Sequence, residues 1–195
     1  MNRRGQRVHE ALGYQLHAAP WRETSLIVQA FTREYGNVAL VAKGAKRPYS
    51  TLRSVLSMFQ PLELSWSGAG EVKTLTRAEC AGVWPLTGRA YMSGWYMNEL
   101  LLRMLPREDP HAVLFDAYDA ALAQLAQGSP AAGALRRFEW ILLTETGYGV
   151  EQPIPDFDDA RAEPDLRALL RERLDEQLAG RPLLTRKVLM ELQRY

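Results

Sequence analysis

The chain has 195 residues, of which 47% are hydrophobic and 24% are charged, and its formal net charge at pH 7 is only +1. This size and composition suffice for one large or two small domains with modest cores. No apolar run approaches the roughly 18 residues of a membrane helix, and no apolar core follows the basic start Met1–Arg7, which excludes a secretory signal and leaves the cytoplasm as the expected location. A single cysteine excludes an intramolecular disulfide and a cysteine metal site.

The first part of the chain predicts a small β-barrel. Five segments are apolar or alternate at strand length, separated by turn formers, and they cover Ala11–Ala18, Ser25–Thr32, Asn37–Ala42, Pro61–Ser67 and Glu71–Arg77. Between the third and fourth segments, apolar residues at helical spacing (Leu52, Val55, Leu56 and Phe59) predict a short helix that plugs one end of the barrel. Five strands with a helix in this position form the oligonucleotide-binding (OB) arrangement, although the strand pattern alone also fits an SH3-like barrel.

Basic residues gather where the third predicted strand ends. Residues 38–53 read VALVAKGAKRPYSTLR, so an apolar strand leads into a loop with four cations. Gly44 permits close backbone approach to a ligand and Pro48 stiffens the following turn, which suits a repeating polyanion; a solvated turn is the plain alternative. Residues 1–82 carry eleven Lys or Arg against six acids, a net charge of +5, whereas the remainder of the chain carries −4.

Aromatic side chains lie among these cations and could stack on bases. Trp21 and Tyr49 fall on predicted loops and are the candidate stacking platforms, whereas Phe31, Phe59 and Trp66 fit the core. The candidate nucleic-acid-binding residues are Trp21, Arg22, Lys43, Lys46, Arg47, Tyr49, Arg53 and Lys73.

After Cys80 the apolar period becomes helical. Proline and glycine punctuate four predicted helices and a short last one, at Gly88–Leu105, Pro110–Gln127, Pro130–Thr146, Pro164–Ala179 and Arg186–Gln193. We therefore predict an α+β protein with a barrel domain over residues 1–82 and an all-helical domain over 83–195. The irregular residues 149–163 contain three aspartates and are expected to form a surface loop or linker.

The sequence contains no pattern typical of an enzyme. Phosphate-binding, dinucleotide-binding, zinc-protease and serine-hydrolase motifs are absent, and His9, His17 and His111 are scattered. No second converging group accompanies the aspartates at 156–159, so we expect no metal site, and Cys80 lacks an activating neighbour and is expected to be a buried structural thiol. We predict no catalytic residue and no cofactor.

The order of several short motifs resembles a known family. They comprise Pro20–Leu26, Val41–Ala45, Glu71–Leu75, Asn98–Leu101, Leu135–Glu139, Gly147–Gly149 and Gly180–Arg186. Their spacing over nearly the whole chain is similar to that in the RecO family of bacterial DNA repair proteins. Some members carry a four-cysteine zinc site after the Gly-Tyr-Gly motif, which this chain cannot form, and the region after Val150 looks shorter than is usual.

The resemblance implies an OB fold followed by a helical domain, and a protein that binds single- and double-stranded DNA. It also implies annealing of complementary strands and a mediator role in recombination. In that role the family works with RecR on strands coated by single-stranded-DNA-binding protein (SSB) and helps RecA to load. A cytoplasmic, nucleoid-associated location follows.

The resemblance also points to a partner site on the third predicted helix. SSB ends in a short acidic and apolar tail, whose capture needs an apolar groove with a cation. Arg136 and Arg137, which follow Leu135, resemble the basic pair of the family there. Because adjacent helical positions point about 100° apart, we expect one arginine to face the groove and favour Arg136; both could instead be ordinary surface charges.

Two other classes remain open from the sequence. An OB-fold adaptor for structured RNA would share the barrel and the basic loop but would prefer folded RNA to single strands. A metal-dependent nuclease would need converging carboxylates around a metal ion.

Overall fold

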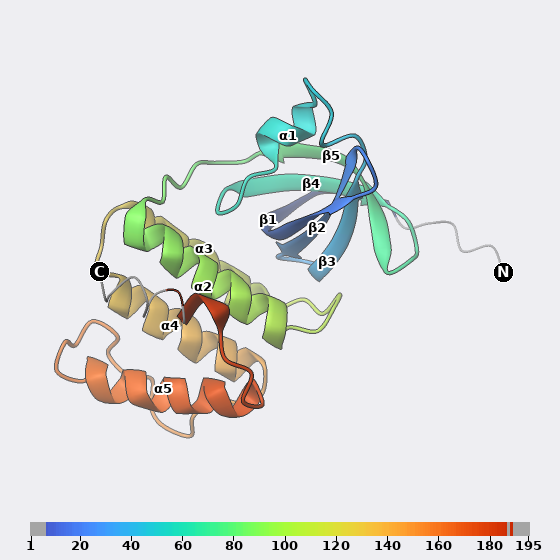
Figure 1. Cartoon of the computed structure of the whole chain (residues 1–195). Helices are drawn as coiled ribbons and strands as arrows, with labels where there is room; N and C mark the ends of the chain where they lie inside the picture. The colour runs from blue at the N-terminus through green and yellow to red at the C-terminus, as the bar shows by residue number, and fades with distance from the viewer. Residues whose placement is uncertain (1–6, 187, 189–195) are drawn as a thin grey trace. The chain divides into compact units, whose positions relative to one another are not determined.

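The structure, a computed structural model, describes residues 7–186 and 188. It divides into two compact units (Figure 1). The barrel unit comprises the residues up to Trp84 together with Pro106–Ala112, and the helical unit comprises Pro85–Leu105 and the residues from Val113 onward. Among the described residues, no helix is both long and apolar enough to cross a membrane.

The barrel unit is a closed five-stranded barrel with the strand order β1-β2-β3-β5-β4. Its strands are β1 (Arg7–Trp21), β2 (Ser25–Thr32), β3 (Gly36–Ala42), β4 (Pro61–Ser67) and β5 (Val72–Cys80). Only the β3–β5 pair is parallel, and α1 (Thr51–Val55) lies between β3 and β4 in the chain. This topology confirms the OB-fold prediction.

Strand β1 extends well beyond the predicted segment at both ends. Residues Arg7–Tyr14 pair with β4, and residues Gly13–Trp21 pair with β2, so one bent strand joins two neighbours. The pairing with β4 shifts register between Val8 and Ala11, where Glu10 has a φ of 52°. Such bulges bend a strand and break its two-residue alternation, which is why the sequence pattern shows only its middle.

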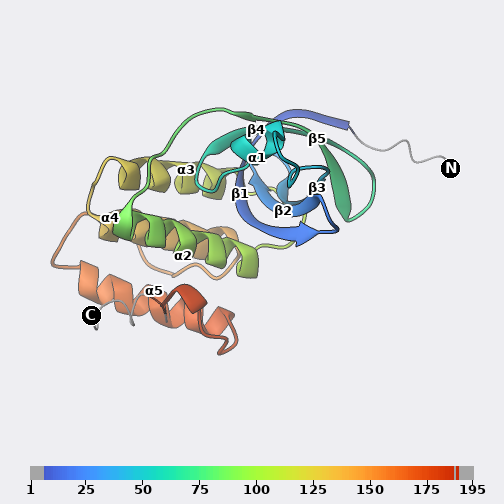
Figure 2. The same cartoon turned by 45° about the horizontal axis from the view of Figure 1, so that its top comes forward.

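The barrel core is the set of apolar side chains that the strands turn inward, including Val28, Leu40 and Leu64. Phe31, Phe59 and Trp66 are all buried, as predicted. The side chains of Leu52, Val55 and Leu56 pack against this core from α1 and its end, and Figure 2 shows α1 over the barrel. The short helix is therefore the predicted plug, although it ends at Val55 because the backbone leaves the helical conformation at Leu56, whose ψ is 83°.

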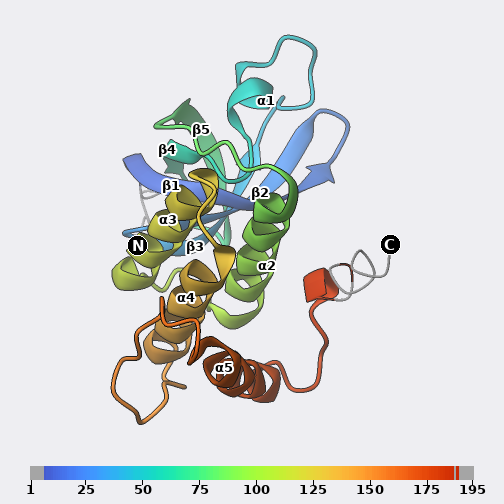
Figure 3. The same cartoon turned by 90° about the vertical axis from the view of Figure 1, so that its left-hand side faces the viewer.

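The helical unit contains four helices, all within a few residues of the predicted bounds. They are α2 (Gly88–Met104), α3 (Ala112–Ala126), α4 (Ala131–Glu145) and α5 (Glu163–Gln177). Tyr118 of α3 bonds Asn98 of α2 through its hydroxyl at 2.6 Å and packs on Phe138 of α4. Helix α5 lies along α4 (Figure 3).

The closing segment, residues 180–186, is held by α2. The Glu99 carboxylate accepts the backbone N–H groups of Leu184 and Thr185 at 2.9 Å each, together with the Thr185 hydroxyl at 2.6 Å. Partial burial alone would raise the pKa of Glu99, but these bonds and the nearby Arg103 outweigh it and lower that pKa. Thr185 thus binds α2 from within a helical turn at 184–186, and most of the last predicted helix, Arg186–Gln193, lies outside the described residues.

The prediction that Cys80 is a buried structural thiol was wrong. Cys80 is exposed at the end of β5, and its Sγ lies 3.0 Å from the carbonyl oxygen of Gly82. The strand extends past Arg77, so the cysteine lies at the rim of the barrel instead of in a packed junction.

Gly36, at the turn between β2 and β3, should tolerate substitution by alanine much less well than Gly44, on the loop after β3. Gly36 has a φ of 65°, and an added Cβ would lie 2.0 Å from the carbonyl oxygen of Asp109, whereas Gly44 has a φ of 73° with no neighbouring atom closer than 3.6 Å. Gly44→Ala should therefore cost about 1 kcal/mol from backbone strain alone, and Gly36→Ala about 3 kcal/mol because the steric clash is added. Chemical denaturation followed by near-UV circular dichroism measures both; equal losses would contradict the packing of 106–112 on this turn.

Candidate nucleic-acid interface and partner-binding helix

The β1–β2 turn and the loop after β3 lie at the same end of the barrel. Trp21 pairs with Ser25 at the end of the first hairpin, and Leu26 pairs with Ala42, the last residue of β3. The backbone N–H of Lys46 donates to the carbonyl oxygen of Thr24 at 2.9 Å, which ties the loop to the turn. Figure 3 shows the two segments on one side of the barrel. We call this surface the cationic end; its side chains are those of Trp21, Arg22, Lys43, Lys46, Arg47, Tyr49 and Arg53.

The cations of this surface all point into solvent. Arg22, Lys43, Lys46, Arg47 and Arg53 are exposed, and within the described part of the chain no acidic side chain forms an ion pair with any of them. Their charges are therefore available to a polyanion, which can release its counterions on binding.

Two exposed rings accompany these cations: Tyr49 lies on the loop after β3, as predicted, whereas Trp21 is not on a loop but is the last residue of β1. Trp21 is 45% exposed and Tyr49 is fully exposed. The Arg22 guanidinium carbon lies 5.9 Å from the centre of the Trp21 ring, so a charge and a stacking surface are presented side by side. Exposed aromatic faces next to cations are the usual elements of a single-strand binding surface.

Backbone hydrogen bonds hold the loop while its side chains stay outside. The Arg47 N–H donates to the Gly44 carbonyl oxygen at 3.0 Å, and the Ser50 N–H donates to the Arg47 carbonyl oxygen at 3.2 Å. Between them, the Ala45 side chain is buried in the barrel core. The chain therefore anchors the loop with a small apolar residue and leaves the long cationic side chains outside.

Lys73 lies apart from the other candidates. Its side chain is buried, its ammonium bonds the Glu108 carboxylate, and it lies 3.4 Å from the Gly70 carbonyl oxygen. It lines a cavity of about 180 Å³ at the β2–β3 turn, the opposite end of those strands, together with Tyr35 and Trp66. The structure therefore does not bring Lys73 to the cationic end, because its partner Glu108 comes from the segment between α2 and α3.

Arg136 of α4 is also buried and paired. Its guanidinium donates to Glu139 at 2.9 Å and lies 3.9 Å from the Glu163 carboxylate. The Tyr96 hydroxyl of α2 donates to the same Glu139 carboxylate at 2.7 Å. Burial raises the pKa of Glu139, and Arg136 opposes that rise. Arg136 thus stabilises the packing of α4 within the helical unit, and the structure does not place it on an open surface.

Arg137 faces the other way and remains half exposed. Its guanidinium carbon lies 5.1 Å from the centre of the Phe157 ring, and its Nη2 lies 3.7 Å from the Asp158 carboxylate. Leu135 is partly buried. Of the basic pair, only Arg137 is presented at the surface, and it already contacts an aromatic and an acidic residue.

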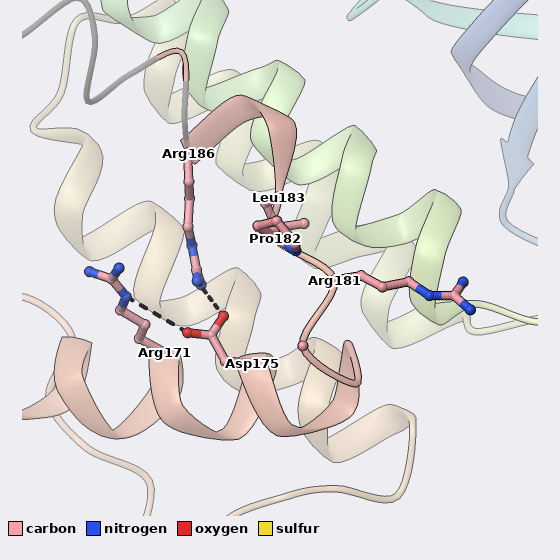
Figure 4. A pocket seen from close by; sticks show the side chains of 7 residues that line it. Arg171, Asp175, Arg181, Pro182, Leu183 and Arg186 are labelled. Carbon is pink, nitrogen blue, oxygen red and sulfur yellow. Dashed lines mark hydrogen bonds and ion pairs between the residues drawn. The ribbon is translucent and has the colours of Figure 1, made fainter.

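The sequence reasoning gave no role to a pocket beside the closing segment. This pocket has a volume of about 400 Å³ and is lined by Arg171, Asp175, Gly180, Arg181, Pro182, Leu183 and Arg186. In Figure 4, Arg171 and Arg186 converge on Asp175, while Arg181 points away from them. The motif Gly180–Arg186 marks the place in the sequence, but the partner Asp175 is visible only in the fold.

Sequence comparisons match both units to one family. The family model "Recombination protein O N terminal" matches residues 7–84, and "Recombination protein O C terminal" matches residues 85–152. The chain is 44% identical over 234 residues to the DNA repair protein RecO of Cupriavidus metallidurans, covering 96% of this chain and 78% of the relative. It is equally similar to the RecO of Aromatoleum aromaticum, covering 96% of this chain and 98% of the relative.

A third relative matches a shorter stretch more closely. The RecO of an Azoarcus species is 54% identical over 147 residues, which is 75% of this chain and 60% of the relative. Alignments of 234 residues are longer than the 195 residues of this chain, so those relatives carry residues that have no counterpart here. With both family models matched in order and relatives of this similarity along nearly its whole length, the chain belongs to the RecO family of DNA repair proteins.

Proposed function

We propose that this RecO family member is a DNA-binding recombination mediator that anneals complementary single strands. In this proposal it acts with RecR on SSB-coated DNA in the cytoplasm, at the nucleoid, and helps RecA to load. The observation that carries the proposal is the cationic end, which combines two exposed rings with five exposed cations that have no acidic partner in the described part of the chain.

Annealing needs no catalytic group. Two complementary strands repel each other, and a surface that neutralises phosphates of both strands raises their rate of encounter. Base pairing then supplies the free energy. The exposed faces of Trp21 and Tyr49 can stack on bases of any sequence, so binding does not have to favour one strand over its complement.

The helical unit provides a plausible separate site for the SSB tail. An acidic and apolar tail requires a cation beside an apolar surface, and Arg137 and Trp140, three residues apart on α4, provide these two features. We therefore place the partner contact on Arg137 and not on Arg136, whose charge is matched by Glu139 inside the unit.

The first test is DNA binding by the barrel loop. The double variant Lys43→Ala/Arg47→Ala should bind single-stranded DNA more weakly, and its plot of log affinity against log salt should be shallower by about 0.7 for each lost phosphate contact. The control Arg171→Ala/Arg173→Ala removes the same charge from α5 and should leave the slope unchanged. Gel shifts with single-stranded DNA, duplex DNA and tRNA provide the measurement. Unchanged binding by the barrel variant would remove the loop from the site. A preference for tRNA would favour the alternative of an RNA-binding adaptor.

The second test is annealing without a cofactor. Protein treated with EDTA should anneal complementary oligonucleotides at the full rate without ATP, because base pairing is the only energy source required. A fluorophore and quencher on the two strands report the rate, and intact strands recovered on a denaturing gel exclude cleavage. A strict requirement for ATP or a metal ion would sink the proposed mechanism.

The third test separates the two arginines of α4. Arg137→Ala should weaken binding of a labelled SSB tail peptide by about tenfold or more, since a charged hydrogen bond contributes about 1.5–3 kcal/mol, with little change in thermal stability. Arg136→Ala should instead destabilise the protein by about 3 kcal/mol, because it leaves the Glu139 charge buried and unpaired. Fluorescence anisotropy and thermal melts measure the two effects. If folded Arg136→Ala loses the peptide and Arg137→Ala keeps it, the site lies on the other face of α4.

A further inference from the structure

One face of α4 is covered by a segment of the chain itself. Gly133, Arg137 and Trp140 share this face because they are four and three residues apart, and we call them the α4 stripe. Phe157, from the loop before α5, is 8% exposed, and its ring centre lies 6.2 Å from that of Trp140 in an edge-on arrangement. The Arg137 guanidinium lies over the same ring at 5.1 Å.

The loop backbone contacts the helix directly at Gly133. A Cβ built at this position would lie 2.8 Å from Oδ1 of Asp158 and 3.0 Å from the carbonyl oxygen of Phe157. The other carboxylate oxygen of Asp158 lies 3.7 Å from Arg137. An aromatic ring and a neighbouring carboxylate are therefore held by a cation, a second ring and a glycine gap, all on one helix face.

The residues that make this contact have the composition of an acidic, apolar peptide. Residues 154–159 read Ile-Pro-Asp-Phe-Asp-Asp, and we call them the IPDFDD segment. The surface beneath it carries the cation and the apolar contacts on which the proposed capture of an acidic, apolar tail depends. Both ligands would place an apolar side chain and a carboxylate at Arg137.

We propose that the IPDFDD segment is an internal ligand of the α4 stripe and that an acidic, apolar peptide binds there by displacing it. This inference rests on the proposed function of the helical unit and adds its regulation. The tail of SSB is the partner to which the proposal commits, because its charge and apolar character match those of the segment it would replace.

The contact is built so that it can open. Asp158 is 81% exposed and Arg137 is 47% exposed in their side chains, so their ion pair is solvated and weak. Ile154 is 78% exposed, and most of the segment's burial comes from the single ring of Phe157. A competing peptide can bind only the fraction of molecules in which the segment has left the α4 stripe. Its apparent affinity is therefore its affinity for the open site multiplied by that fraction.

The test compares two double variants of the loop. Phe157→Ala/Asp158→Ala removes both contacts with the α4 stripe. The control Tyr148→Ala/Glu151→Ala removes one aromatic and one acidic side chain, both exposed, from the residues just before the segment. If the segment covers the stripe about 80–90% of the time, the first variant should bind a fluorescein-labelled SSB tail peptide about five- to tenfold more tightly than the wild type, and the control should be unchanged.

Equal affinities of the wild type and the first variant overturn the inference and leave the proposed function standing. Should the first variant fail to fold, Asp158→Asn, at an exposed side chain, replaces it and should tighten binding in the same direction; no tightening overturns the inference. If the tail peptide binds no variant, the proposed function fails. In that case a labelled peptide of residues 152–161 tests the internal ligand directly. The inference is supported if this peptide binds the Phe157→Ala/Asp158→Ala variant and the binding is lost when Arg137→Ala is added. It is overturned if the peptide does not bind.

Discussion

Closure of the barrel by β1 is the constraint on which the proposed DNA surface depends. A closed sheet leaves no unpaired edge, but one strand must bend enough to pair with both of its neighbours. Strand β1 does this by shifting register along its pairing with each neighbour, between Val8 and Ala11 and between Gln15 and His17. Within the closed sheet, the β2–β3 register places the end of the first hairpin beside the exit of β3, where the backbone N–H of Lys46 donates to the Thr24 carbonyl oxygen.

The two ends of the β2–β3 hairpin have opposite electrostatic characters. At the cationic end no acidic side chain among the described residues pairs with the charges, and backbone hydrogen bonds hold the loop that carries them. At the other end Lys73 and Glu108 neutralise each other beside the edge-on rings of Tyr35 and Trp66. The available positive charge of residues 1–82 therefore lies mainly at one end of the barrel. A charge placed at one end orients a polyanion more strongly than the same net charge spread evenly would.

The sequence predicted the strands and helices better than it predicted the contacts between side chains. Strands such as Ser25–Thr32 and the four long helices follow from apolar periodicity and from Gly and Pro punctuation, which are local signals. The start of β1 was missed because a bulge near Glu10 interrupts the alternation, and its end was missed because Pro20 indicates a turn. The loop cations and loop rings were placed correctly in solvent because strand ends and turns are also local features.

The sequence could not predict which side chains from distant parts of the chain contact each other. Glu108 approaches Lys73 from 35 residues away, and Tyr96 reaches Glu139 from 43 residues away. The choice between Arg136 and Arg137 had one local clue, because Glu139 is three residues beyond Arg136 and can pair with it on the same helix. The contact of Phe157 with Trp140 had none, since an irregular loop carries no periodicity from which its path could be read.

The exposure of Cys80 has a practical consequence. It is the only cysteine of the chain, and it lies at the rim of the barrel unit, paired in register with Leu62. A maleimide dye would therefore modify the native sequence at one known position. Energy transfer from that dye to a labelled oligonucleotide would then report the path of a strand across the barrel without the introduction of a single mutation.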